Sequence, residues 1–148
     1  QGGWDLHGGI AQRAANNARQ LDPAIGAIMD DLKERGLFED TLIDITSECG
    51  RSPTEDGGGG RSHNARGLST VLMGGGIKGG IAYGSTDEIG GAAVENKVHV
   101  KDIHATVMDL LGFDHEQLTY RTAGRDFRLT QATRSLPQGG MPVKGIIA

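Results

Sequence analysis

Residues 41–73, with the sequence TLIDITSECGRSPTEDGGGGRSHNARGLSTVLM, contain two short apolar stretches separated by a long polar one. The first stretch, 41–46, alternates in polarity and is rich in β-branched residues, which predicts a strand. Residues 68–73 predict a second strand, which ends at a run of glycines. Residues 47–67 show no periodicity, so we interpret them as a polar loop at the carboxyl end of the first strand.

The residues before this stretch predict a helix. Apolar side chains recur at spacings of three and four between residues 10 and 35, which indicates a helix in one or two pieces. Asp22 and Pro23 are typical of a helix start, and Gly36 is typical of a helix end.

The second half of the chain predicts a short strand at 97–100 and a helix at 102–112. Asp102 is the expected N-cap, and a loop-rich tail begins at about residue 113, with a short strand or helix near its end. The apolar spacing predicts that the helix buries Ile103, Val107, Leu110 and Leu111.

This order of elements predicts an α/β fold, with a mainly parallel sheet and helices on its faces. We expect a single domain over residues 1–148, because that length suits one hydrophobic core. Ligands of such folds bind beyond the carboxyl ends of the strands, which is where the loop 47–67 would lie.

The composition limits the partners that we expect. The net charge is −4, from 15 basic and 19 acidic residues, which argues against a nucleic-acid groove or an anionic membrane surface. The sequence has no apolar run of membrane-spanning length and no signal-peptide pattern, so we expect a soluble chain. The single cysteine, Cys49, excludes an intramolecular disulfide. Small ligands or metal ions fit this composition better.

The motif GGWDLHGG, residues 2–9, offers a pair of metal ligands. In an extended segment Asp5 and His7 point to the same side, so both side chains can reach one ion. Such a pair is also common in loops that bind nothing, so the motif alone leaves both readings open.

Other candidate ligands fall at predicted strand ends or helix starts. Their alternative roles are a solvated acid for Glu48, a surface-loop residue for His63 and a half-buried residue for His104. The glycine run before His63 could fold the chain back toward the strand end. Mixed carboxylate and imidazole donors suit zinc, manganese or iron rather than calcium, and the candidates suffice for two ions. The full set of expected ligands is Asp5, His7, Glu48, His63 and His104.

Cysteine chemistry is an alternative. Cys49 could act as a nucleophile with His63 or His104 as its base, and the nearby Arg51 would favour the thiolate. A lone cysteine at a strand end is more often a small buried apolar residue.

Several motifs resemble one known family over nearly the whole chain. They are GGWDLHGG, ERGLFEDTLIDITSECGRSP, GRSHNARG, LMGGGIKGGIAYGSTDEIG and KDIHATVMDLLGFDHEQLTYRTAGRDFRLT. Together they resemble the C-terminal portion of a bacterial sulfatase-like family of unassigned function in the alkaline phosphatase superfamily. The resemblance implies a truncated domain corresponding to about the last third of longer members, in which Asp and His ligands hold two metal ions.

The resemblance also implies roles for the candidate residues. Asp5, His7 and His104 would hold one ion, and Glu48 would be the acidic ligand of the second. His63 would correspond to the histidine of a motif of the family. Because the nucleophile of the superfamily comes from a part that this chain lacks, a metal-bound hydroxide is the expected nucleophile. Arginines would bind the anionic oxygens of the ester, and the candidates are Arg51, Arg61 and Arg66.

The expected function is therefore a metal-dependent hydrolase of small phosphate or sulfate esters, with zinc or alternatively manganese as its cofactor. The alternative is a non-catalytic remnant of a longer enzyme that binds metal or oligomerises. We expect a homodimer or higher homo-oligomer, because the missing part would leave sheet edges and apolar faces uncovered. A bacterial cytoplasm or periplasm would suit such a chain.

Overall fold

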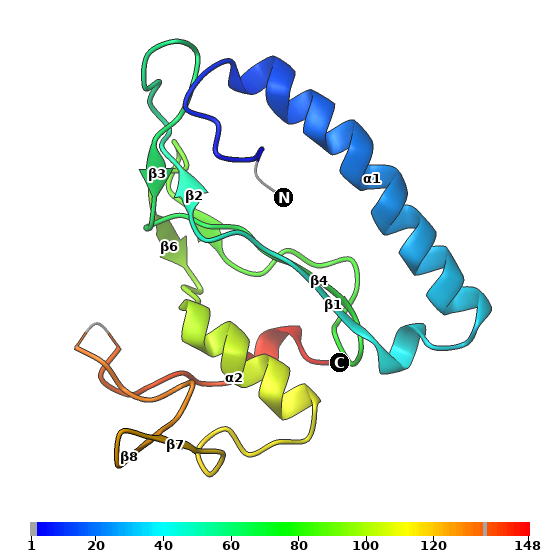
Figure 1. Cartoon of the computed structure of the whole chain (residues 1–148), viewed down its shortest axis with the longest axis vertical. Helices are drawn as coiled ribbons and strands as arrows, with labels where there is room; N and C mark the ends of the chain where they lie inside the picture. Colours follow the sequence, from blue (N-terminus) through cyan, green and yellow to red (C-terminus); the bar gives the residue numbers. More distant parts are fainter. Residues whose placement is uncertain (1–2, 135) are drawn as a thin grey trace.

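The computed structural model describes residues 3–134 and 136–148, and Figure 1 shows the arrangement of its elements. A long helix runs along one side of the molecule, and a second helix lies beside the C-terminal segment. Two of the short strands run between these helices, and the last two lie at the lower end of the view. The helical elements are α1 (Ile10–Glu34), η1 (Phe38–Asp40), α2 (Val100–Leu110) and η2 (Lys144–Ile146). The strands are β1 (Leu42–Ile45), β2 (Gly50–Arg51), β3 (His63–Asn64), β4 (Val71–Gly74), β5 (Ser85–Thr86), β6 (Ala93–Glu95), β7 (Tyr120–Thr122) and β8 (Arg125–Phe127).

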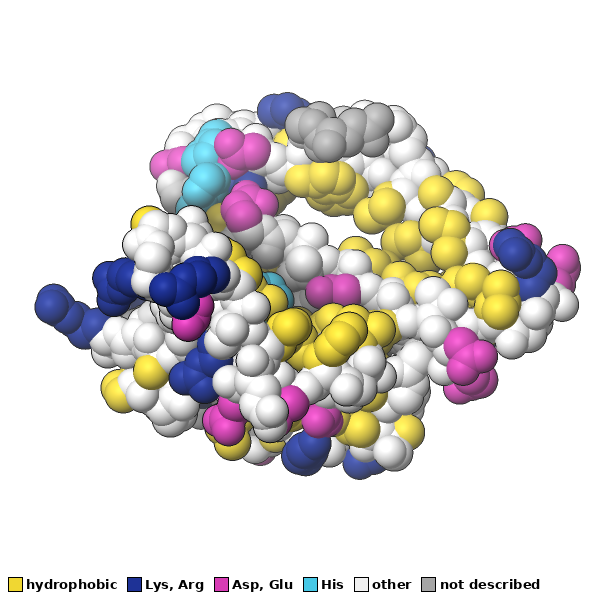
Figure 2. Space-filling model, turned by 60° about the horizontal axis from the view of Figure 1, so that its bottom comes forward, with side chains coloured by type: hydrophobic (Ala, Val, Ile, Leu, Met, Phe, Trp, Pro, Cys, Tyr) yellow, Lys and Arg dark blue, Asp and Glu magenta, His cyan; other side chains and the backbone are white. Residues whose placement is uncertain are grey.

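The predicted first helix is confirmed as one continuous element, α1. Pro23 lies in its interior, so Asp22 and Pro23 do not start a helix. The helix ends where Gly36 adopts a left-handed conformation with φ of 68°, which glycine reaches without steric cost. None of its residues is buried. Figure 2 shows hydrophobic side chains exposed at the surface on the side of the molecule where α1 lies.

The two strands predicted within residues 41–73 are present as β1 and β4, but the expected parallel sheet is wrong. β1 pairs with β4 in an antiparallel register, Leu42 opposite Gly74 and Ile45 opposite Val71. The other described sheets are also antiparallel pairs: β2 with β3, β5 with β6 and β7 with β8. The described helices therefore do not flank a parallel sheet as an α/β fold requires.

The connection between β1 and β4 explains this difference. Parallel neighbours need a crossover of a dozen residues or more, usually a helix. The chain between β1 and β4 forms no helix and instead folds into the β2–β3 hairpin. The chain therefore returns alongside β1 in the opposite direction.

Helix α2 begins earlier than the sequence predicts. Residues 97–100 form no strand, and His99 rather than Asp102 is the N-cap. The His99 ring accepts a hydrogen bond from the Lys101 backbone N–H at 3.1 Å, and Asp102 accepts one from the His99 backbone N–H at 2.8 Å. This reciprocal capping box places His104 beyond the first turn of the helix.

The predicted buried stripe of α2 is also wrong. The helix buries Ala105, Thr106 and Met108, and Leu111 is exposed. The C-terminal segment covers this face, because the Thr106 hydroxyl accepts a hydrogen bond from the Val143 backbone N–H at 2.9 Å. Within the described part of the chain, the buried hydrophobic core is small and consists of Leu6, Ala105, Met108, Leu136, Val143 and Ile146.

Among the described residues, no helix combines the length and the apolar character that crossing a lipid bilayer requires.

Candidate metal centre

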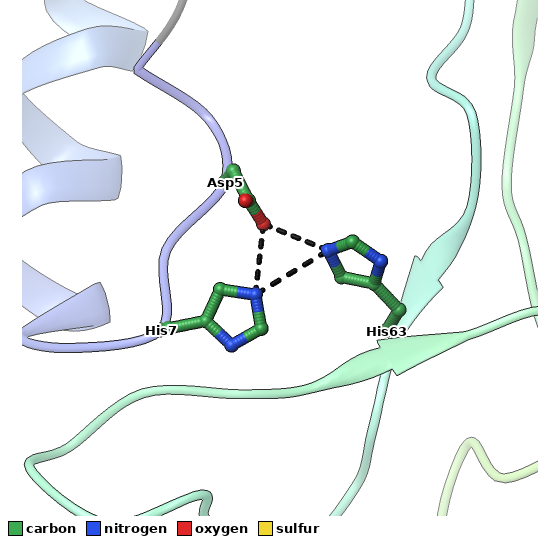
Figure 3. Close-up of side chains that lie close together, drawn as sticks. All are labelled: Asp5, His7 and His63. Carbon is green, nitrogen blue, oxygen red and sulfur yellow. Dashed lines mark hydrogen bonds and ion pairs between the residues drawn. The ribbon is translucent and has the colours of Figure 1, made fainter.

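Asp5, His7 and His63 meet at one point on the surface, and we call them the three-donor cluster (Figure 3). Asp5 Oδ1 lies 2.8 Å from His63 Nε2 and 3.1 Å from His7 Nε2, and the two Nε2 atoms are 3.4 Å apart. Donors that each lie about 2.1 Å from one ion are about 3.0–3.4 Å apart in octahedral or tetrahedral geometry. The spacing of these three atoms therefore suits a single divalent ion.

The N-terminal segment is held against the glycine run by backbone hydrogen bonds. The Gly9 N–H donates to the carbonyl of Gly58 at 2.9 Å, and the Arg61 N–H donates to the carbonyl of Leu6 at 3.2 Å. A Cβ atom at Gly60 would lie 2.1 Å from the carbonyl carbon of His7, so only glycine permits this approach. The glycine run thus brings strand β3, which begins at His63, beside the N-terminal segment.

Leu6 anchors the same segment from the other side. Leu6 is only 2% exposed, whereas its neighbours Asp5 and His7 are exposed. This alternation places the two polar side chains on the surface and the apolar one inside, as an extended segment allows. Figure 2 shows histidine and acidic side chains gathered on the molecular surface.

Asp56 contacts the side of the His7 ring that does not face the cluster. Its Oδ2 atom lies 3.1 Å from His7 Nδ1. An N–H at Nδ1 that donates to this carboxylate leaves the lone pair on Nε2, which is the nitrogen that faces Asp5 and His63. Hydrogen bonds from Ser62 and His7 lower the pKa of Asp56, so this carboxylate is ionised at neutral pH.

Arg51 fixes Asp5. Its guanidinium donates to Asp5 Oδ1 at 2.8 Å and to the backbone carbonyls of Trp4 at 3.2 Å and Arg61 at 3.4 Å. The hydrogen bond with His63, and after it the one with Arg51, lower the pKa of Asp5 from 3.8 to about 2. Asp5 is therefore a carboxylate over the whole neutral range.

Glu48, Cys49 and His63 form a second group of possible donors, which we call the thiol cluster. One ligand atom from each residue lies within 4.8 Å of the others. The Cys49 thiol donates to Glu48 Oε1 over 3.8 Å, and Glu48 Oε1 lies 4.0 Å from the Arg51 guanidinium. His63 thus belongs to both clusters.

The remaining candidate residues lie outside these clusters. His104 belongs to neither donor group found among residues 3–134 and 136–148. Arg61 donates to the carbonyl of its neighbour Gly60 at 3.2 Å. Arg66 is exposed, and its guanidinium forms no hydrogen bond or ion pair within the part of the chain that the structure describes.

Sequence reasoning missed Asp56 as a functional residue. The available signal was its position directly before the glycine run at 57–60. A run that folds the chain back onto another segment also brings the residues beside it to that segment.

The fold and the cluster define a small chain of helices and antiparallel strand pairs with an exposed group of histidine and carboxylate donors. The chain belongs to the family described as Protein of unknown function (DUF1501), whose family model matches residues 1–138. No curated protein and no solved structure matches the chain.

This result corrects the resemblance drawn from the sequence motifs. The matching family is one of unknown function and is not a sulfatase family. Nothing in the comparisons shows a relation to the alkaline phosphatase superfamily. The roles that the resemblance implied therefore lose that support, and the candidate site depends on its own geometry.

Proposed function

We propose that the protein binds a divalent metal ion at Asp5, His7 and His63 and uses it to hydrolyse a phosphate or sulfate ester. The observation that carries this proposal is the triangle of donor atoms, with sides of 2.8, 3.1 and 3.4 Å. Two imidazoles and one carboxylate suit zinc or manganese better than calcium.

The number of donors and their exposure support a catalytic role. Catalytic zinc sites have three protein ligands and leave a position for water or substrate, whereas structural sites have four. The side chains of Asp5, His7 and His63 are 61%, 48% and 52% exposed, so solvent reaches the cluster. When bound there, a divalent ion would lower the pKa of coordinated water to about 7 and supply hydroxide at neutral pH.

The surrounding residues would prepare this site without touching the ester. Asp56 holds the His7 ring with Nε2 toward the other donors, and Arg51 holds Asp5 in place. The guanidinium of Arg51 therefore forms its hydrogen bonds within the protein.

Arg61 and Arg66, on either side of His63 in the chain, are the arginines that we propose for binding the anionic oxygens of the ester.

Metal binding without turnover is the second candidate function. The location of the cluster outside the hollows of the surface favours it. Substrate sites are usually concave. Two hollows of the described surface are lined by other residues. One is lined by residues 109, 112–116 and 141–142, and the other by residues 39–40, 42, 75–76 and 110–111. Neither hollow includes a residue of the three-donor cluster.

Manganese titration followed by electron paramagnetic resonance tests the binding step. We expect the free-manganese signal to fall as the protein binds the ion. His7→Ala and Asp5→Asn should weaken binding more than about 100-fold, because second-shell partners alone are worth about 10- to 100-fold. Asp30→Asn is the matched control, since Asp30 is exposed on α1 and forms no side-chain hydrogen bond or ion pair with the described residues.

Ester hydrolysis distinguishes the two candidate functions. We expect the metal-loaded protein to hydrolyse nitrophenyl phosphate or nitrophenyl sulfate, and expect chelation or His7→Ala to abolish turnover. Manganese binding without turnover above that of the His7→Ala variant would support the second candidate. Failure of the wild-type chain to bind manganese or zinc would overturn both.

A further inference from the structure

The thiol cluster lies beside the three-donor cluster and offers a different set of donors. Glu48 and Cys49 lie between strands β1 and β2, and His63 belongs to strand β3. The Ser47 hydroxyl donates to the Cys49 carbonyl at 2.9 Å, which fixes the backbone of this turn. A carboxylate, a thiol and an imidazole from two separated segments therefore meet at one place.

We propose that Glu48, Cys49 and His63 form a second cation site, selective for a thiophilic divalent ion such as zinc or cadmium. It goes beyond the proposed function, and the two sites share one residue, His63. Nε2 of His63 faces Asp5 and His7. The ring has a second nitrogen, which is not used in the three-donor cluster.

The chemistry of the donors separates the two sites. A thiolate is a soft ligand that selects zinc and related ions, whereas manganese prefers oxygen and imidazole donors. Cys49 is half-buried and not in a disulfide. The Arg51 guanidinium lies 2.8 Å from Asp5 and 4.0 Å from Glu48, so it contacts one carboxylate of each cluster.

The distances require only a small adjustment. Donors around a tetrahedral zinc ion that include one sulfur lie about 3.3–3.8 Å apart. The ligand atoms of the thiol cluster lie within 4.8 Å of one another. Because the Glu48 side chain is 70% exposed, it can rotate to bring its carboxylate closer.

Absorption spectroscopy with cobalt and cadmium tests this proposal on the whole chain. Cys49 is the only cysteine, so a thiolate-to-metal charge-transfer band reports on it alone. We expect the band in the wild-type protein and in the His7→Ala variant, and expect Cys49→Ser to abolish it. Glu48→Gln and His63→Ala should each weaken cadmium binding at least about tenfold, since each removes a ligand.

Glu88→Gln is the control for Glu48→Gln, because Glu88 is exposed and belongs to neither cluster.

The rate of alkylation of Cys49 provides a second measurement. Bound cadmium should slow the reaction at least about tenfold, because a coordinated thiolate is not a free nucleophile. Manganese should leave the rate unchanged.

The outcomes distinguish this proposal from the proposed function. A charge-transfer band in a protein that binds no manganese and hydrolyses no ester would support the second site and contradict the proposed function. Absence of the band from the wild-type protein would overturn the second site. Equal cadmium binding by wild type, Glu48→Gln and His63→Ala would also overturn it, because the thiol would then bind without the cluster.

Discussion

Asp56 Oδ2 lies 3.1 Å from Nδ1 of His7, whose other ring nitrogen faces Asp5 and His63. A carboxylate in this position selects the tautomer in which Nε2 carries the lone pair. The contact joins the loop before the glycine run to the N-terminal segment, so this hydrogen bond orients a candidate ligand and adds to the backbone hydrogen bonds between the two segments.

Replacing Asp56 should therefore weaken metal binding without removing a donor. We expect Asp56→Ala to lower manganese affinity about 10-fold and Asp56→Asn to lower it less, because an amide oxygen still accepts the hydrogen bond. Titration calorimetry checks the affinity. Asp30→Asn should retain wild-type affinity. If Asp56→Ala also retains it, Asp56 does not orient His7 for metal binding.

Gly60→Ala should disrupt the three-donor cluster from a position outside it. The added Cβ would lie 2.1 Å from the His7 carbonyl carbon, so the N-terminal segment must move. We expect a loss of manganese affinity of at least about tenfold, comparable with the loss of an orienting partner. Gly26→Ala in α1 is the control, because nothing lies within 4 Å of the added atom. That substitution should stabilise the helix by about 1 kcal/mol.

The depressed pKa of Asp5 predicts a loss of stability in acid. A carboxyl whose pKa is lower in the folded state than in the unfolded state stabilises the fold fully above the unfolded value, here 3.8. This stabilisation disappears as the pH falls through the folded value of about 2.

Urea unfolding at pH values between about 5 and 2 measures this effect. The midpoint of the wild-type protein should fall more steeply than that of Asp5→Asn, whose amide does not titrate. Low ionic strength is needed because Asp5 is exposed and salt screens its interactions. Parallel curves for the two proteins would show that Asp5 contributes nothing to the acid sensitivity.

Thr106→Val should destabilise the contact between α2 and the C-terminal segment. Valine matches the shape of threonine but leaves the Val143 backbone N–H without its 2.9 Å acceptor in a buried position. We expect a cost of about 1–3 kcal/mol in the free energy of unfolding. Thr122→Val on the exposed strand β7 is the control and should change stability by less than about 0.5 kcal/mol. Equal stability of the two variants would contradict the role given to this hydrogen bond.

The His104→Gln variant tests whether His104 is a metal ligand. The sequence led us to expect His104 as a ligand, whereas the structure places it on α2 outside both donor groups. We expect its manganese affinity to stay within about twofold of wild type, because no donor is lost. A large loss of manganese affinity in titration calorimetry, with an unchanged circular dichroism spectrum, would show that His104 is a ligand.

The sequence was informative where the signal was local. The spacing of apolar residues located α1, and the β-branched alternation at 41–46 located β1. The N-cap of α2 was missed because imidazole is an unusual cap, and His99 lies between two valines that mimic a strand. The direction of β4 relative to β1 depends on a distant pairing, which local patterns do not encode.

The candidate site was predictable in part for the same reason. Alternation along an extended segment places Asp5 and His7 together, and the glycine run before His63 allowed the chain to fold back. The partners Asp56 and Arg51 depend on how two separate segments dock. His104 was included through an expected parallel sheet edge, and that edge does not exist in the described fold.

The hydrogen-bonded atoms of Asp5 and His63 are separated by 58 positions in the sequence. Closing a loop of that length costs conformational entropy, which the contacts between the donors must offset. An ion that binds only the assembled donors would shift the equilibrium toward the docked N-terminal segment. A bound ion would then fasten residues 3–9 to the rest of the chain. Removal of the ion would expose these residues to proteases well before the rest of the molecule unfolds.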